Sequence, residues 1–245
     1  MDQQIADKLI AWAERYDNPR YFEEDPIAFP RRFYNMMTTI QPVLGFEGGE
    51  WRPSLQDVEI AAVFAAHFAW GRRAMIVRDC SRLFDEMMWR PYDYVMAGDW
   101  RSDNTSIHRT VKWSEVAAIC RRLRDFYSAN DSLETLTAEQ TRVRIFGQKE
   151  DPKAANKKIW MMRRWMVRDD GLVDLGLWKN SDKRDLVIPL DVHVYRQATE
   201  LGLTKRRAKD IFTARDITDS FRELFPDDPA KGDFALFGYG VSSNA

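Results

Sequence analysis

The sequence predicts an all-α protein, and three observations support this fold class. Apolar residues recur at a spacing close to 3.6 along most of the 245-residue chain. Segments with the alternating pattern of a β-strand are weak throughout. The apolar fraction of 44% is ordinary for a globular protein, and no run of eighteen apolar residues is present to span a membrane.

The helices are expected in a definite order along the chain. The first spans 3–16 and leads into an irregular arm over 24–53, which contains the breakers Pro26, Pro30, Pro42, Gly45, Gly48, Gly49 and Pro53. Ser54 then caps a strongly apolar helix, with Asp57 three residues after the cap. Further helices are expected at 75–89, 114–128, 133–145, 153–168, 192–200, 216–225 and 230–238. We therefore expect an N-terminal helix and arm over 1–53 and a helical core over 54–245, forming one structural unit.

The cysteines and the N-terminus indicate a compartment. Cys80 and Cys120 lie inside apolar helical patterns, which favours buried thiols in a reducing compartment over a disulfide. The acidic, polar start of the chain lacks the basic and apolar regions of a signal peptide. We therefore expect a cytoplasmic protein. Two cysteines and three histidines show no zinc or iron–sulfur spacing, so neither a metal nor a cofactor is expected.

Charge is distributed unevenly although the whole chain carries only −1. From Arg142 to Arg168 there are nine Lys or Arg residues and two acids, which leaves +7 in this stretch and −8 in the remainder. A local basic belt suits a polyanionic partner, whereas the alternative is a solvated cationic helix face.

The basic belt includes a helix that is expected over 153–168. Asp151 is expected to cap it, with Pro152 at its first position. The apolar stripe that packs inward consists of Ala155, Ile159, Met162 and Met166. Lys157 lies away from that stripe. It shares its face with Lys153, Trp160, Arg164 and Arg168. Such a face can bind phosphates and can lower the pKa of a lysine within it.

A second informative segment runs from Ile188 to Arg196. Pro189 ends one segment of the chain, and Asp191 starts a helix by accepting backbone N–H bonds. Taken alone, Asp191 is best explained as a helix cap. His193 is expected to orient or pack locally near this helix start.

Here the sequence resembles a known superfamily. Pro189-Leu190-Asp191-Val192-His193-Val194-Tyr195-Arg196, followed by Glu200-Leu201-Gly202-Leu203, is similar to the Pro-Val-Asp-Thr-His-Val-x-Arg segment of helix-hairpin-helix DNA glycosylases. The resemblance covers roughly residues 140–240, and 233–240 is similar to the closing helix of that fold. The hairpin Leu-Pro-Gly-x-Gly is not visible, and only Phe146-Gly147-Gln148 stands in its place. The iron–sulfur cysteines of some members are absent.

The resemblance implies roles for two residues. Asp191 takes the place of the catalytic carboxylate, and Lys157 takes the place of the nucleophile in bifunctional members. Their separation of 34 residues is wider than is usual in the superfamily and resembles that of the archaeal 8-oxoguanine DNA glycosylases. Lys158 is the competing nucleophile, and an ordinary surface lysine is the alternative for Lys157.

Over nearly its full length the chain also resembles a bacterial family of conserved proteins of unknown function. The shared features are Asp25-Pro26, Ala69-Trp70-Gly71-Arg72, Ile107-His108-Arg109-Thr110 and Arg164-Trp165-Met166-Val167-Arg168.

Together these resemblances imply a helix-hairpin-helix DNA glycosylase-like fold and a DNA repair glycosylase, with or without abasic-site lyase activity. The expected partner is double-stranded damaged DNA in the bacterial nucleoid, bound by a monomer with no membrane contact. Expected DNA contacts are Lys153, Lys158, Arg164, Arg168 and Arg196, and the expected base pocket contains Trp70, His108 and Trp160. The alternatives are a non-catalytic DNA- or RNA-binding protein and, third, a helical scaffold with a protein partner.

Overall fold

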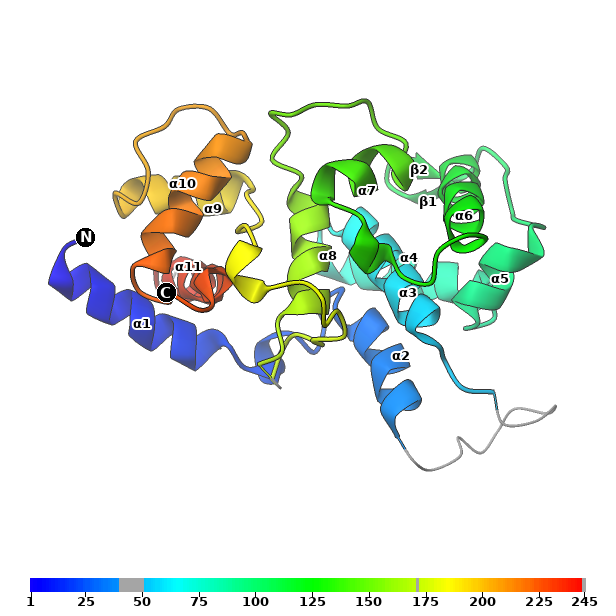
Figure 1. Ribbon diagram of the computed structural model, residues 1–245, viewed down its shortest axis with the longest axis horizontal. Coiled ribbons are helices and arrows are strands. Elements are labelled where there is room, and N and C mark those ends of the chain that lie inside the picture. Colours follow the sequence, from blue (N-terminus) through cyan, green and yellow to red (C-terminus); the bar gives the residue numbers. More distant parts are fainter. Residues whose placement is uncertain (40–50, 171, 244–245) are drawn as a thin grey trace. The chain divides into compact units, whose positions relative to one another are not determined.

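The computed structural model describes residues 1–39, 51–170 and 172–243 (Figure 1). The chain divides into two compact units. Unit 1 comprises residues 1–21 and 150–245, and unit 2 comprises residues 22–149. The boundary predicted from the sequence lies at 53/54, whereas this division falls at 21/22 and 149/150. Both units are helical, which confirms the all-α class.

Unit 1 consists of helices from both ends of the chain. They are α1 (Gln3–Tyr16), η1 (Pro19–Tyr21), α8 (Lys157–Val167), η3 (Lys183–Asp185), α9 (Val192–Glu200), α10 (Ile211–Arg222), η4 (Pro229–Lys231) and α11 (Gly232–Ser243). The first and last α-helices pack along each other, as the blue and red ribbons of Figure 1 show. Leu9 and Ala13 of α1 share a buried core with Ala235 and Leu236 of α11. Packing of α1 against α11 therefore ties the N-terminal segment to the C-terminal half.

The described part of unit 2 consists of six α-helices, two short strands and one 3-10 helix. They are α2 (Ala28–Thr38), α3 (Leu55–Phe68), α4 (Arg73–Glu86), α5 (Pro91–Ala97), β1 (Ser106–His108), β2 (Val111–Lys112), α6 (Trp113–Tyr127), η2 (Leu133–Thr135) and α7 (Ala138–Arg144). Within the described residues, the antiparallel pair β1–β2 is the only sheet.

The central helix of unit 2 is α3, and it is buried on every side from Asp57 to Ala66. Its apolar composition all round is typical of a helix that neighbours enclose, and α2, α4 and α5 all contact it. Ser54 and Asp57 form the expected capping box, with Ser54 N donating to Asp57 Oδ2 over 2.7 Å. Glu59 is fully buried there, and it accepts hydrogen bonds from the Tyr127 hydroxyl and the Leu133 amide.

One helix occurs where prolines predicted irregular chain, since Pro30 lies in the first turn of α2. Pro91 is likewise compatible with a helix, as the first residue of α5. Amides of the first turn have no acceptor inside the helix, so a proline there loses no hydrogen bond. The irregular arm predicted over 24–53 is therefore wrong for 28–38. Its breakers Pro42, Gly45, Gly48 and Gly49 lie outside the described residues.

Other boundaries differ where local caps intervene. The helix predicted over 133–145 is split into η2 and α7, because Thr137 starts a new helix with its own capping box. The helix predicted from 216 begins at Ile211, because the Asp210 side chain accepts from the Thr213 amide and caps it. Among the described residues, no helix is long and apolar enough to cross a membrane.

Candidate active site

Lys157 is the first residue of α8. The helix begins here, and not at 153 as predicted, because Asn156 adopts a left-handed conformation with φ 49° and ψ 39°. Asp151 does not cap the helix. Its carboxylate accepts a hydrogen bond from the Lys153 amide over 3.0 Å, within a turn that precedes α8. The predicted apolar stripe is confirmed for Ile159, Met162 and Met166, which are buried, whereas Ala155 precedes α8 and is partly buried.

Asp191 caps α9, as predicted. Its Oδ1 accepts hydrogen bonds from the amides of His193 and Val194 over 2.9 and 3.0 Å. Within the described residues, no donor forms a hydrogen bond with its Oδ2. One oxygen therefore holds the helix start while the other is available to a ligand. His193 itself is exposed.

Both Lys157 and Asp191 affect the pKa of a third residue, Asp233, in the first turn of α11. Burial raises the pKa of Asp233, Arg164 lowers it, Asp191 raises it further and Lys157 lowers it. All three residues belong to unit 1, although 34 residues separate Lys157 from Asp191.

Lys158 is the second residue of α8. Partial burial, together with the charge of Lys157, lowers the pKa of Lys158 to about 8. An amine with this pKa is partly neutral near physiological pH, and only the neutral form is nucleophilic. The two adjacent lysines therefore both remain candidates for amine chemistry at the start of α8.

Arg164 and Arg168 do not face solvent, which corrects the expectation that they contact DNA phosphates. Their residues are 5% and 1% exposed. Arg164 pairs with Asp174 and with Asp233. Arg168 pairs with four carboxylates, those of Asp17, Asp170, Asp174 and Asp228, at 2.6–3.0 Å. Their charges are therefore neutralised inside unit 1.

The acids of this buried network outnumber its two arginines. Burial raises the pKa of Asp17 to about 6, although the nearby Arg168 lowers it. Burial likewise raises the pKa of Asp174, against the effect of Arg164 and Arg168. The network links the C-terminal half of α8 to Asp17, directly after α1, and to Asp233 in the first turn of α11. It is a structural element of unit 1.

Two of the other expected DNA contacts lie at the surface of unit 1, whereas Lys158 is partly buried. Lys153 is exposed. Arg196, on α9, has a side chain that is 59% exposed and lies 3.9 Å from Glu200. The predicted belt 142–168 is not one helix, because Arg142 and Arg144 belong to α7 of unit 2.

The three expected base-pocket residues are divided between the units. Trp160 belongs to α8 in unit 1, where it packs against the core, and its buried Nε1 has no hydrogen-bond partner within the described residues. Trp70 and His108 belong to unit 2.

His108 has a structural environment in unit 2. It is fully buried, with Nδ1 2.8 Å from Asp79 Oδ2 and Nε2 3.0 Å from the Trp70 carbonyl oxygen. Both of its ring nitrogens are therefore engaged. Arg109 lies over the Trp70 ring at 4.5 Å from its centroid.

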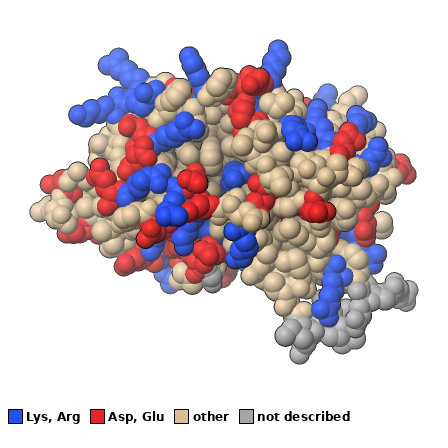
Figure 2. All heavy atoms as spheres, viewed as in Figure 1, with Lys and Arg blue, Asp and Glu red and all other residues tan. Residues whose placement is uncertain are grey.

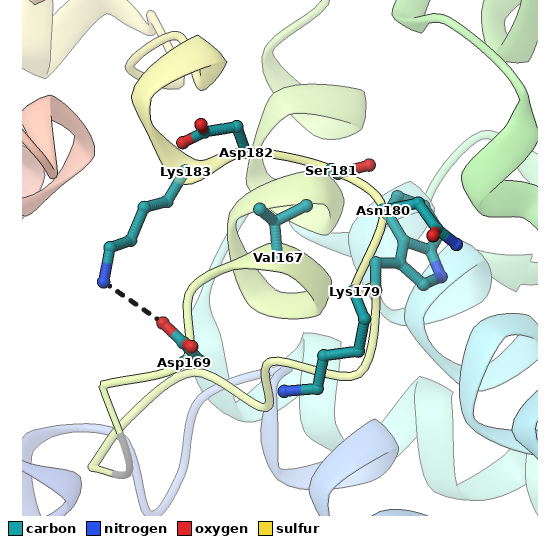
Figure 3. A pocket seen from close by; sticks show the side chains of 8 residues that line it. Val167, Asp169, Lys179, Asn180, Ser181, Asp182 and Lys183 are labelled. Atoms are coloured by element: carbon teal, nitrogen blue, oxygen red, sulfur yellow. Dashed lines mark hydrogen bonds and ion pairs between the residues drawn. The ribbon is translucent and has the colours of Figure 1, made fainter.

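A separate hollow of about 370 Å³ lies at the other end of α8 (Figure 3). It is lined by Val167, Asp169, Trp178 and residues 179–183, and Lys183 pairs with Asp169 at its rim over 3.2 Å. Lys157 and Val167 are ten residues apart, or about 15 Å along the helix. The hollow is thus distinct from the neighbourhood of Lys157. Within the described residues, no group of three His, Cys, Asp or Glu side chains is arranged to hold a metal ion.

Two features of this region were not foreseen from the sequence. The resemblance places Asp233 only within the closing helix, although a carboxylate in the first turn of an apolar helix is a signal. The run Lys205-Arg206-Arg207-Ala208-Lys209 is a second signal, since it has four cations in five residues.

Comparison with known proteins gives a family but no described activity. No curated protein matches the chain. No solved structure matches it either. One family model, described as a protein of unknown function (DUF2400), matches residues 52–151 and 139–242, which is well over half of the chain. The chain therefore belongs to the DUF2400 family of proteins of unknown function.

Proposed function

We propose that this protein is a DNA repair glycosylase with a helix-hairpin-helix glycosylase-like arrangement around α8 and α9. It removes a damaged base, such as an oxidised one, with an amine of α8 and the Asp191 carboxylate. The observation that carries the proposal is the placement of Lys157 at the first position of α8 and of Asp191 at the cap of α9, both in unit 1. A second observation supports it, since Asp191 caps α9 with one oxygen and leaves the other available.

The chemistry needs a neutral amine and a fixed negative charge. The amine lone pair of Lys157 attacks C1′ of the damaged nucleotide, and the C1′–N bond breaks with its electron pair leaving on the base. The base then takes up a proton. Asp191 stabilises the positive charge that develops on the sugar. The attacking amine loses its protons as the sugar ring opens, which gives a Schiff base, and elimination of the 3′ phosphate can follow.

Lys158 competes with Lys157 for the nucleophilic role. Position in the resembled motif favours Lys157, whereas the lowered pKa favours Lys158. Either assignment uses Asp191 in the same way.

Borohydride trapping on duplex DNA with an abasic site tests the proposal, because reduction makes a Schiff base permanent. The wild-type protein should become covalently linked, Lys157→Gln should not, and Lys158→Gln should retain trapping. The reverse pattern assigns the nucleophile to Lys158. If the wild type binds damaged duplexes but neither traps nor releases a base, the protein is a non-catalytic nucleic-acid-binding module.

A further inference from the structure

The connection between α9 and α10 carries a concentrated positive charge that the candidate active site does not use. Its cations are Lys205, Arg206, Arg207 and Lys209, with Asp210 as the following acid. Figure 2 shows Lys and Arg side chains projecting from the edge of the molecule where this connection lies in Figure 1. Residues 205–209 are all exposed.

The backbone of this connection is firmly anchored. The Tyr195 hydroxyl of α9 donates to the carbonyls of Arg206 and Arg207 over 3.0 and 3.2 Å. Thr213 Oγ1 of α10 donates to the Ala208 carbonyl over 2.6 Å. Ser220 Oγ donates to the Leu203 carbonyl over 2.9 Å. The cations therefore project from a fixed support and lose little backbone entropy when they bind a ligand.

Lys153 joins these cations from the other side. Its carbonyl accepts a hydrogen bond from the Ile211 amide over 3.0 Å, which places the turn before α8 beside the start of α10. Arg206 Nε donates a hydrogen bond to Thr213 Oγ1, so this side chain is not counted among the cations available to a ligand. We call the remaining set the basic patch: Lys153, Lys205, Arg207 and Lys209.

The basic patch lacks the acids that accompany several other cations of unit 1. Arg184, Arg196 and Arg222 each have a carboxylate within 4.0 Å, from Asp182, Glu200 and Asp219 respectively. Within the described part of the chain, no carboxylate pairs with a side chain of the basic patch. Four exposed cations held together without counter-charges favour a polyanion, because binding releases its condensed counterions.

The patch also adjoins the candidate active site. Tyr195, which holds the connection, lies one helical turn after Asp191, and Lys209 Nζ lies 5.3 Å from the Tyr195 ring centroid. Lys153 precedes Lys157 by four residues. A polyanion on the patch therefore passes close to Lys157 and Asp191.

We infer that the basic patch binds the phosphate backbone of duplex DNA beside the nucleotide held at Lys157 and Asp191, an inference that rests on the proposed function for its partner. A single-strand binder needs a row of exposed aromatic rings, and this region has one, Phe212 at 45% exposed. A membrane-binding surface needs a broad apolar face beside its cations. Neither accompanies the patch, so the duplex backbone fits it best.

Fluorescence anisotropy with a labelled DNA duplex across a salt series tests the inference. The triple variant Lys205→Glu, Arg207→Glu, Lys209→Glu should bind on the order of 100-fold more weakly at 0.1 M salt, with a salt slope flatter by about 3. The control is Lys8→Glu, Lys179→Glu, Arg184→Glu, which changes the net charge equally with exposed residues elsewhere in unit 1. It should bind like the wild type.

Each other outcome has a definite meaning. Equal losses in the two triple variants, or none in either, overturn the inference, as does tighter wild-type binding to RNA or to anionic vesicles than to duplex DNA. If the triple variant fails to fold, Lys205→Gln and Arg207→Gln must each flatten the slope by about 1 for the inference to stand. If the triple variant loses binding as expected but the wild type is not trapped by borohydride, the basic patch still binds duplex DNA. Only the proposed glycosylase chemistry is then wrong.

Discussion

Arg164 donates a hydrogen bond from Nη1 to the carboxylate of Asp233, which lies 69 residues further along the chain. The bond ties the middle of α8 to the first turn of α11. Asp233 is also the carboxyl whose pKa responds to Lys157 and Asp191. Arg164 thus holds Asp233 in place from inside the protein.

Replacing Arg164 should therefore cost folding stability. In Arg164→Met, the buried carboxylates of Asp174 and Asp233 lose a counter-charge, and the free energy of unfolding should fall by about 3–5 kcal/mol. Urea denaturation measures it. Arg196→Met is the matched control, since its exposed ion pair should change stability by no more than about 0.5 kcal/mol. Equal denaturation midpoints for the two variants would contradict a structural role for Arg164.

Replacing His108 should also reduce the stability of the fold. It is fully buried between Asp79 and the Trp70 carbonyl, so it offers no free edge to a flipped base. His108→Phe removes one hydrogen-bond partner each from Asp79 Oδ2 and from the Trp70 carbonyl, and the free energy of unfolding should fall by about 1–3 kcal/mol. Thermal or urea denaturation measures this loss. If the variant keeps wild-type stability but releases a different damaged base, His108 contacts the base and its role is not structural.

Much of the helical pattern could be predicted because it depends on neighbours in sequence. The spans 3–16 and 192–200 match α1 and α9, and the caps at Ser54 and Asp191 are both present. Helical periodicity and capping are local properties, so a single sequence reveals them. Helix α2 was missed because a proline in the first turn has the same composition signal as a proline in a loop.

The roles of Arg164 and Arg168 could not be predicted, because their partners are remote in sequence. On a helical wheel both arginines share the face of Lys157, and their charges suggest a solvated or phosphate-binding surface. Asp17, Asp228 and Asp233 meet them only when α1 and α11 pack beside α8. The interaction of Asp233 with Arg164 could not be predicted for the same reason. The joint assignment of Lys157 and Asp191 to one active site came from the resemblance.

Lys158 should make stability depend on pH in the alkaline range. Its pKa falls from 10.5 in the unfolded chain to about 8 in the folded protein. Between these values the unfolded chain binds more protons, so this residue makes the folded state more stable as pH rises from about 8 to about 10.5. Subtracting the unfolding free energy of Lys158→Met from that of the wild type isolates the effect from tyrosines and thiols. A difference that stays constant over this range would contradict the lowered pKa.

Asp191 can be tested for both of its functions with two substitutions. Asp191→Asn keeps a side-chain oxygen for the amides of His193 and Val194 but removes the negative charge. It should therefore fold like the wild type and slow base release on the order of 100-fold or more, by analogy with the loss of single electrostatic groups elsewhere. Asp191→Ala removes the cap as well, and should cost about 1 kcal/mol of stability in addition to the lost activity. Single-turnover base release and urea denaturation, measured on both variants, separate the two effects. If both variants release every damaged base as fast as the wild type and only the Ala variant is less stable, Asp191 is a helix cap alone, and the proposed chemistry at Lys157 loses the carboxylate on which it depends.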